Sequence, residues 1–226
     1  MQTATQTVRE VRITTAEGTL FGDLIAPARA AALVFFVNGR GRGRHCVDDR
    51  TLAGPLHAGR VATLMLDLLT TDEQQARPHS GQRGVDIPLL TRRVMEVAEW
   101  VRLQPELSPL PLGLCGVAAG SAPALIAAAR LGAQVQALVS VGGSPDQAGP
   151  TVLSTIRAPT LLLAGSRDAE RVALNEAAYR QLRGERSLAV IPGGGPLLEE
   201  PGVLEHAGAM AADWFVSHLL ALEPAD

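Results

Sequence analysis

The sequence contains no lysine, and all 20 of its basic residues are arginine. This absence excludes a P-loop lysine, a pyridoxal-phosphate Schiff base and a lysine general base. Only two cysteines are present, so no disulfide framework is expected. The net charge of -3 provides no basic surface for nucleic acid. No apolar run reaches membrane-spanning length and the N-terminal residues are polar, which predicts a cytoplasmic protein.

The composition is that of a globular domain. Hydrophobic residues make up 46% of the 226 residues and charged residues 19%. This length suits one domain with a sizeable core, so we expect a single domain over 1–226 with flexible ends at 1–7 and 222–226. The segment "HCVDD" (45–49) lacks the paired spacing of a structural zinc site. We therefore expect no metal and no cofactor, and predict a loop there whose aspartate caps the following helix.

Short apolar runs alternate with helical patterns along the chain. Most runs show no polar alternation, which is typical of strands buried on both faces of a parallel sheet. An N-terminal hairpin turning at Glu17-Gly18 precedes them. The sequence therefore predicts an α/β fold, a doubly wound and mostly parallel sheet with helices on both faces. The predicted strands are 32–37, 61–68, 112–115, 137–141, 160–165 and 187–191, and the predicted helices cover 87–101, 121–133, 174–182 and 207–215.

Ligands of such sheets bind at the carboxyl ends of the strands. One of these ends, "GVAAG" (116–120), has the frame of G-x-S-x-G, the sharp turn that presents a nucleophilic serine. The middle residue is Ala118. The loop 68–84 follows another strand, and "RRV" (92–94) in the next helix is expected to face solvent.

From about residue 8 to 220 the chain resembles the dienelactone hydrolase-like branch of the α/β-hydrolases. The resemblance is carried by "LVFFVNGRGRGRH", "DIPLLTRRVMEVAEWVRLQP", "APTLLLAGSRD" and "VIPGGGPLLEEPG", in that order. It implies a single-domain α/β-hydrolase fold and a Ser–Asp–His triad. Carried over by position, the serine is replaced by Ala118, the acid is Asp168 and the histidine is replaced by Pro196. Asn38 stands where the oxyanion loop commonly opens with histidine.

Alanine offers no nucleophile and proline no imidazole, so acyl transfer at these positions is not available. We expect a pseudoenzyme that keeps its pocket, with Asp168 as a remnant acid. It would bind a small ligand, an active paralogue or a second copy of itself. The alternative is an esterase, dienelactone hydrolase, lyase or cyclase with another catalytic set. Cys46 beside His45 is a candidate for this other catalytic set. Cys115 and Ser121 are expected to be structural.

The glycine-arginine loop after the strand 32–37 suggests an anion site. Backbone amides, a helix N-terminus and arginines together could bind a carboxylate or phosphate. The competing interpretation is a solvated loop with its arginines pointing outward. His79, in the long loop 69–85, is the only plausible replacement base. The predicted ligand-binding residues are Asn38, Gly39, Arg40, Arg42, Arg44, Ala118, Ala119 and His79.

Overall fold

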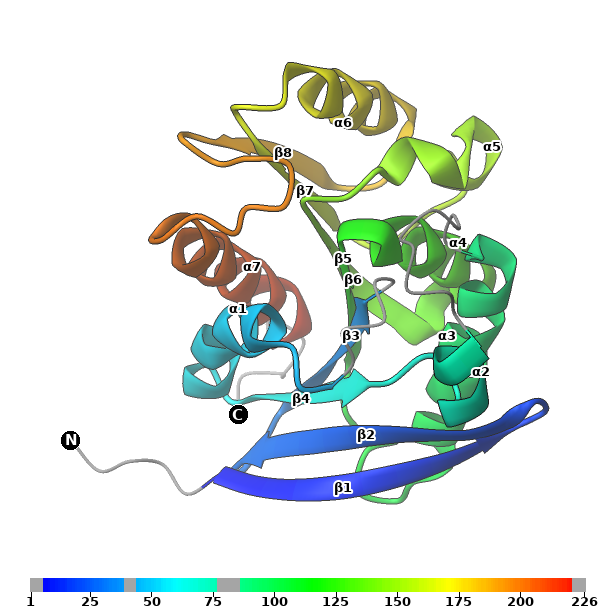
Figure 1. Ribbon diagram of the computed structural model, residues 1–226. Helices are drawn as coiled ribbons and strands as arrows, with labels where there is room; N and C mark the ends of the chain where they lie inside the picture. The colour runs from blue at the N-terminus through cyan, green and yellow to red at the C-terminus, as the bar shows by residue number, and fades with distance from the viewer. Residues whose placement is uncertain (1–5, 39–43, 77–85, 221–226) are drawn as a thin grey trace.

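The computed structural model describes residues 6–38, 44–76 and 86–220 (Figure 1). An eight-stranded sheet runs through the molecule in the order β1-β2-β4-β3-β5-β6-β7-β8. The β1–β2 hairpin and the β2–β4 pair are antiparallel, and every other neighbouring pair is parallel. The strands are β1 (Gln6–Thr15), β2 (Gly18–Pro27), β3 (Ala32–Asn38), β4 (Val61–Leu66), β5 (Leu112–Val117), β6 (Val135–Val141), β7 (Thr160–Gly165) and β8 (Arg186–Ile191).

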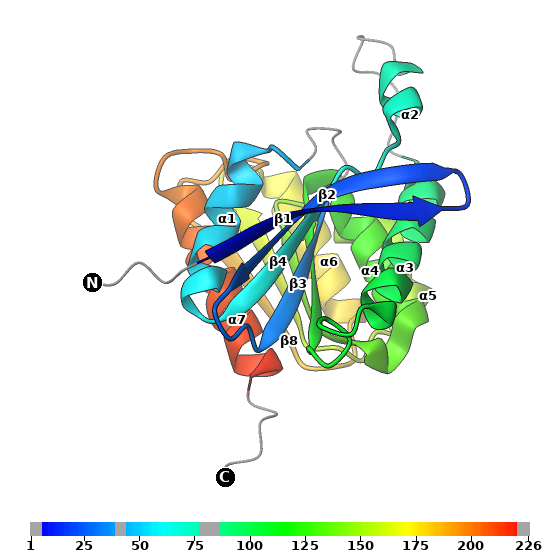
Figure 2. The same ribbon diagram turned by 90° about the horizontal axis from the view of Figure 1, so that it is seen from below.

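Helices cover both faces of this sheet (Figure 2). Helices α1 and α7 pack on one face, and α3, α4, α5 and α6 contribute to the core on the other. The α-helices are α1 (Val47–Ala58), α2 (Thr71–Ala76), α3 (Ile87–Leu103), α4 (Ser121–Leu131), α5 (Pro150–Leu153), α6 (Ala169–Gln181) and α7 (Val203–Leu219). Three 3₁₀ turns are η1 (Ala118–Gly120), η2 (Gly132–Gln134) and η3 (Pro145–Ala148).

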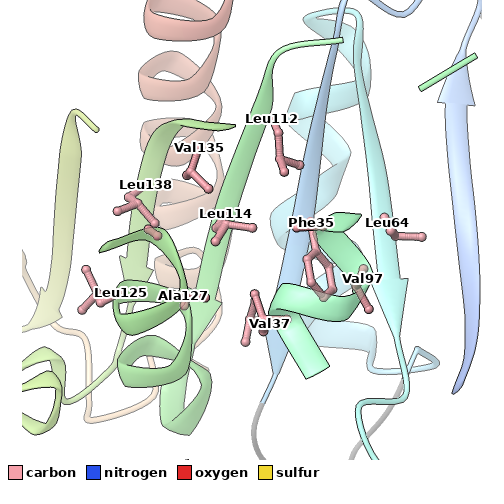
Figure 3. Close-up of a cluster of buried hydrophobic side chains, with 14 of the residues drawn as sticks. Phe35, Val37, Leu64, Val97, Leu112, Leu114, Leu125, Ala127, Val135 and Leu138 are labelled. Carbon is pink, nitrogen blue, oxygen red and sulfur yellow. The ribbon is translucent and has the colours of Figure 1, made fainter. Parts of the chain in front are cut away.

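The central strands are buried on both sides, as their unbroken apolar runs predict. Phe35 and Leu114 pack toward α3 and α4, where Figure 3 shows them beside Leu138 and Val97. Phe36 and the other alternate side chains of the same strands pack toward α1 and α7. Burying each large apolar side chain contributes about 1.5–3 kcal/mol to folding, so these two layers stabilise the fold.

The predicted fold class is confirmed, and the hairpin turns where it was expected, with Thr15 paired to Gly18. Three local predictions are wrong. Residues 71–76 form helix α2 rather than loop, because Thr70 and Glu73 exchange hydrogen bonds that start a helical turn. No aspartate caps α1, because Cys46 holds the N-cap position without a side-chain hydrogen bond. Arg93 is fully buried rather than solvated.

Candidate functional site

The site is built on the turn that joins β5 to α4. Strand β5 ends at Val117, η1 makes the turn and α4 begins at Ser121. Ala118 sits at the apex with a φ of +50°, in the left-handed region that a residue with a Cβ adopts at a cost of about 1–2 kcal/mol. A nucleophile elbow is a strained strand-to-helix turn of this kind. The backbone therefore has the shape of an elbow, and the residue at its apex is an alanine.

Two glycines hold the turn in this shape. A Cβ on Gly120 would lie 1.8 Å from the Val37 carbonyl oxygen of β3, and one on Gly116 would lie 2.6 Å from the Ser121 Cα. Neither position admits a side chain without moving the backbone. The glycine frame is thus required by the packing of β3, β5 and α4, whether or not the turn carries a nucleophile.

The polar side chains next to the elbow are structural. The fully buried Ser121 donates its hydroxyl to the Gly116 carbonyl oxygen at 3.1 Å and accepts from the Ser140 hydroxyl at 2.9 Å. Cys115 is buried in β5, and this burial raises the pKa of its thiol far above the ordinary value. Neither residue lines the hollow described next, so neither is placed to act as a nucleophile.

A small hollow of about 20 Å³ lies against Ala118, which is room for roughly one water molecule. Three acidic residues line it, Asp48 and Asp49 at the start of α1 and Glu199 in the loop before α7. The described part of its lining contains no histidine and no arginine. Its residues are Asn38, Cys46, Asp48, Asp49, Leu52, Val117, Ala118, Val141, Leu197, Glu199 and Leu204.

Asn38 and Cys46 are the uncharged polar residues of this hollow. Asn38 ends β3 beside Val117 and donates its side-chain amide to Asp49 at 2.8 Å. The Cys46 sulfur lies 3.9 Å from an Asp48 carboxylate oxygen. Burial, with some contribution from the Asp48 and Asp49 charges, raises the pKa of this thiol. A reactive thiolate needs the opposite, an electropositive setting. His45, which precedes Cys46, is exposed.

Asp168 has a structural role. Its side chain caps α6 by accepting from the Arg171 backbone N–H at 2.9 Å, and it accepts from the Arg171 guanidinium at 3.2 Å. The same guanidinium donates to the Ser144 hydroxyl. The Arg171 backbone hydrogen bond and guanidinium lower the pKa of Asp168. These contacts favour the charged carboxylate and are those of a helix cap, and no imidazole of the described residues is among them.

Pro196 lies at the edge of the site. A Cβ on Gly142, just past β6, would lie 3.0 Å from the Pro196 carbonyl oxygen, so the two loops touch. Pro196 is exposed, and its neighbour Leu197 lines the hollow. The position implied for the catalytic histidine is therefore close to the elbow, but it holds a ring without a titratable group.

Arg44 turns away from the hollow. Its guanidinium lies 3.1 Å from Glu10, 3.4 Å from Asp23 and 3.6 Å from Asp67, and its backbone N–H donates to Asp67. These contacts tie the end of the glycine-arginine loop to the β1–β2 hairpin and to Asp67, the residue after β4. Arg44 is thus placed as a structural ion pair rather than in the lining of the hollow.

Of the other predicted ligand-binding residues, only Ala119 lies in the part of the chain that the structure describes. Ala119 is half-buried within η1, next to the apex. Gly39, Arg40, Arg42 and His79 lie outside the described residues. Within 6–38, 44–76 and 86–220, no group of three or more metal-ligating side chains is found that could hold a metal ion. Over the same ranges, no helix is long and apolar enough to cross a membrane.

Several residues of the hollow were not anticipated from the sequence. Asp48 and Asp49 were expected in a loop, with an aspartate as the cap of the following helix, and Glu199 was not among the predicted site residues. Their positions follow from two facts of topology: α1 starts where the loop after β3 ends, and the loop after β8 crosses to the elbow. The acidic pair just after the expected oxyanion loop was the available signal.

Nearly the whole chain, and not only the elbow, is similar to a known hydrolase. The dienelactone hydrolase of Anabaena variabilis is 36% identical, and the match covers 95% of this chain and 99% of that one with a TM-score of 0.90. The chain belongs to the dienelactone hydrolase family of α/β-hydrolases. The esterase Est1E of Butyrivibrio proteoclasticus, 14% identical with a TM-score of 0.78, covers 94% of this chain and 99% of its own and shares the fold. No family model matches the sequence.

Longer relatives of this dienelactone hydrolase-family chain are also known. Two Mycobacterium tuberculosis proteins, named as candidate phosphoribosyl transferases, are 39% identical over 215 residues, which is 95% of this chain. The chain spans about half the length of these curated relatives, 47% in each case.

Proposed function

We propose that this chain is a non-hydrolytic member of the dienelactone hydrolase family that binds a small ligand at its elbow face, where the described hollow alone has room for about one water molecule. The observation that carries the proposal is Ala118, whose methyl group stands at the left-handed apex where a nucleophile would be presented. Pro196, at the implied histidine position, removes the base as well. The carboxylate at the acid position, Asp168, is engaged by the cap of α6 and by the Arg171 guanidinium.

The test is a comparison of the natural chain with Ala118→Ser and with Ala118→Ser/Pro196→His. We expect the natural chain neither to react with a fluorophosphonate probe nor to hydrolyse p-nitrophenyl acetate above the rate in buffer. The double variant restores a hydroxyl and an imidazole, and each of these is needed for acyl transfer. Labelling of the natural chain together with ester turnover would overturn the proposal.

The charge of the ligand is a second part of the proposal. The anionic ligand expected from the sequence depends on Arg40 and Arg42, which lie outside the described residues. The described lining also contains Asp48, Asp49 and Glu199, and each of these carboxylates already takes part in an interaction, so a cation would have to replace an existing partner. Thermal shift measurements with phosphate, acetate, guanidinium and methylammonium distinguish an anionic from a cationic ligand. Stabilisation by only the anions, or by only the cations, gives the sign of the charge that the site binds.

One observation favours the alternative of an enzyme with a different nucleophile. Cys46 is the one thiol lining the described hollow, and it lies there together with Ala118. Its raised pKa makes it a weak nucleophile near neutral pH. If the natural chain turns over an ester and Cys46→Ala abolishes this activity, while Cys115→Ala retains it, the enzyme alternative replaces the binding proposal.

The longer relatives suggest a partner. Because this chain matches only about half of them, we propose that it works beside a phosphoribosyl transferase unit, to which their name would then apply. The test mixes this chain with the separately produced unmatched half of the Mycobacterium tuberculosis relative. Co-elution in size-exclusion chromatography with a mass equal to the sum is expected, and independent elution at micromolar concentrations would contradict it.

A further inference from the structure

A larger cavity lies at the opposite end of the sheet from the elbow. It has a volume of about 180 Å³ and opens beside Leu112, the first residue of β5, whereas the elbow follows the last residue of this strand. Its floor is apolar and comes from Ala98 and Val101 of α3 together with Leu107 and Leu112. An apolar cavity of about 150 Å³ in another protein takes up a benzene molecule, so one small ring fits this volume.

A β-bulge brings a polar side chain to this cavity. In the ladder between β5 and β6, Leu112 pairs with Val135 and Gly113 pairs with Ala137, so Gln136 is the extra residue. A bulge of this kind redirects a side chain and is common at functional positions. Here it lets Gln136 line the cavity, although its neighbour Val135 belongs to the core on the same side of the sheet.

The Gln136 side chain is left with an unused acceptor. Its Oε1 atom is buried and has no hydrogen-bond partner in the part of the chain that the structure describes. A buried acceptor without a donor is costly, and most such groups in folded proteins are satisfied. A ligand in the cavity with an N–H group near Gln136 would supply the donor, once the side-chain amide turns its shielded Oε1 atom toward the cavity.

The charged residue in the described lining of the cavity is Arg102, and it is already paired with Glu99, which lies outside the lining. Arg102 donates through Nε at 2.8 Å and Nη2 at 2.5 Å to the two carboxylate oxygens of Glu99. This pair lowers the pKa of Glu99 and raises that of Arg102, so both groups are charged over the whole physiological range and their charges cancel. The site therefore favours a neutral ligand over an anion.

The wall of the cavity is preformed. The segment between α3 and β5 is tied by backbone hydrogen bonds from Leu107 and Ser108 to the Gln104 carbonyl oxygen and from Leu110 to that of Leu107. Its prolines at 105, 109 and 111 restrict the backbone further. A wall that is already ordered loses little conformational entropy when a ligand binds.

We propose that this cavity is a second binding site, for a small neutral planar ring that carries an N–H donor, as a primary aromatic carboxamide does. The ring packs on Val101, Leu107 and Leu112, and the N–H donates to the Gln136 Oε1. The site is independent of the elbow and of the function proposed for it.

The test is an NMR titration of the full chain with benzamide, with benzoate as the probe that has the same ring but no N–H and a negative charge. Benzamide should shift the amide resonances of Ala98, Leu107 and Leu112 and leave that of Ala118 unchanged. Gln136→Leu should weaken benzamide binding by about tenfold, the effect expected of one hydrogen bond to a buried group. Gln181→Leu, at an exposed glutamine of α6, is the matched control and should bind as the natural chain does.

A third variant checks the location without touching the hydrogen bond. Val101→Phe fills the cavity and should abolish binding, and its folding is verified by the unchanged dispersion of the remaining amide resonances. The proposal is overturned if benzamide shifts none of the cavity resonances up to its solubility limit. It is equally overturned if benzoate binds as well as benzamide, or if Gln136→Leu binds benzamide as the natural chain does.

Discussion

Arg93 joins three parts of the structure that are distant in sequence. Its replacement by methionine tests how much these buried contacts contribute to the stability of the fold. The side chain, on α3, is 0% exposed. It donates to the Thr15 hydroxyl at 2.7 Å and to Glu73 at 3.0 Å, and it lies 3.0 Å from Glu17. It therefore links the tip of the β1–β2 hairpin and the first turn of α2 to α3.

The magnitude follows from the exposure of the partners. Breaking a fully buried ion pair costs about 3–5 kcal/mol because a charge is left unpaired in the interior. In this case the carboxylates of Glu73 and Glu17 are 31% and 40% exposed, so water can partly solvate them once Arg93 is gone. We expect Arg93→Met to lower the free energy of unfolding by about 2–3 kcal/mol, between the values for buried and exposed pairs.

The assay is urea unfolding followed by circular dichroism, with the melting temperature as a second measure. For a chain of this size, each kcal/mol corresponds to about 2–4 °C, so the melting temperature should fall by about 4–12 °C. Arg92→Met is the control: Arg92 is exposed, pairs with Glu17 at 2.7 Å and should change the melting temperature little. Equal effects of the two variants on the melting temperature would refute the idea that Arg93 stabilises the fold by linking the hairpin and α2 to α3.

A double variant tests the electrostatic part of the reasoning. Glu73→Gln keeps an oxygen that can accept from the Thr70 backbone N–H, as Glu73 does at 2.7 Å. Combined with Arg93→Met, it removes the uncompensated charge, so Arg93→Met/Glu73→Gln should be more stable than Arg93→Met alone. A double variant that is less stable than Arg93→Met would show that the lost packing of Arg93, and not the stranded charge, dominates.

Three further predictions concern the elbow face and the helices around it. Gly120→Ala should destabilise the fold by about 1–3 kcal/mol or more, measured by urea unfolding, because the new methyl meets a β3 carbonyl oxygen; unchanged stability would contradict the close approach. Burial lowers the pKa of His57, so its neutral form stabilises the fold above about pH 6.5 and this contribution is lost as pH falls; His57→Gln should flatten the pH dependence of the unfolding free energy in this range. Asp168→Ala should lower the melting temperature whereas Asp168→Asn, which can still cap, should lower it less; equal losses would show that the Arg171 ion pair, and not the cap, is responsible.

Much of the fold could be predicted from the sequence because its signals are local. The apolar run 160–165 coincides with β7, and Asp86 caps α3 at the predicted start by accepting from the Leu89 N–H. The elbow could be located as well, because the two glycines of "GVAAG" are fixed in spacing by the turn itself. Periodicity and capping operate over a few residues, which is the distance over which a sequence can be interpreted directly.

The rest depends on contacts between distant segments. Helical spacing places Arg93 closer than Arg92 to the buried stripe of α3, but its complete burial depends on Thr15 and Glu73, which come from distant parts of the sequence. Arg44 shows the same limit: the carboxylates that hold it come from β1, β2 and the residue after β4. Its place in an arginine-rich loop suggested a ligand, whereas the tertiary structure supplies its counter-ions.

The left-handed apex at Ala118 has a consequence for how the family can evolve. The turn is imposed by neighbouring backbone, through Gly120 against β3 and Gly116 against α4, and not by the side chain at its tip. The residue at position 118 can therefore change under selection without any change in the glycines that fix the backbone of the turn. A lineage can lose or regain a hydroxyl there by exchanging one small residue for another, while its backbone stays superposable on that of its relatives.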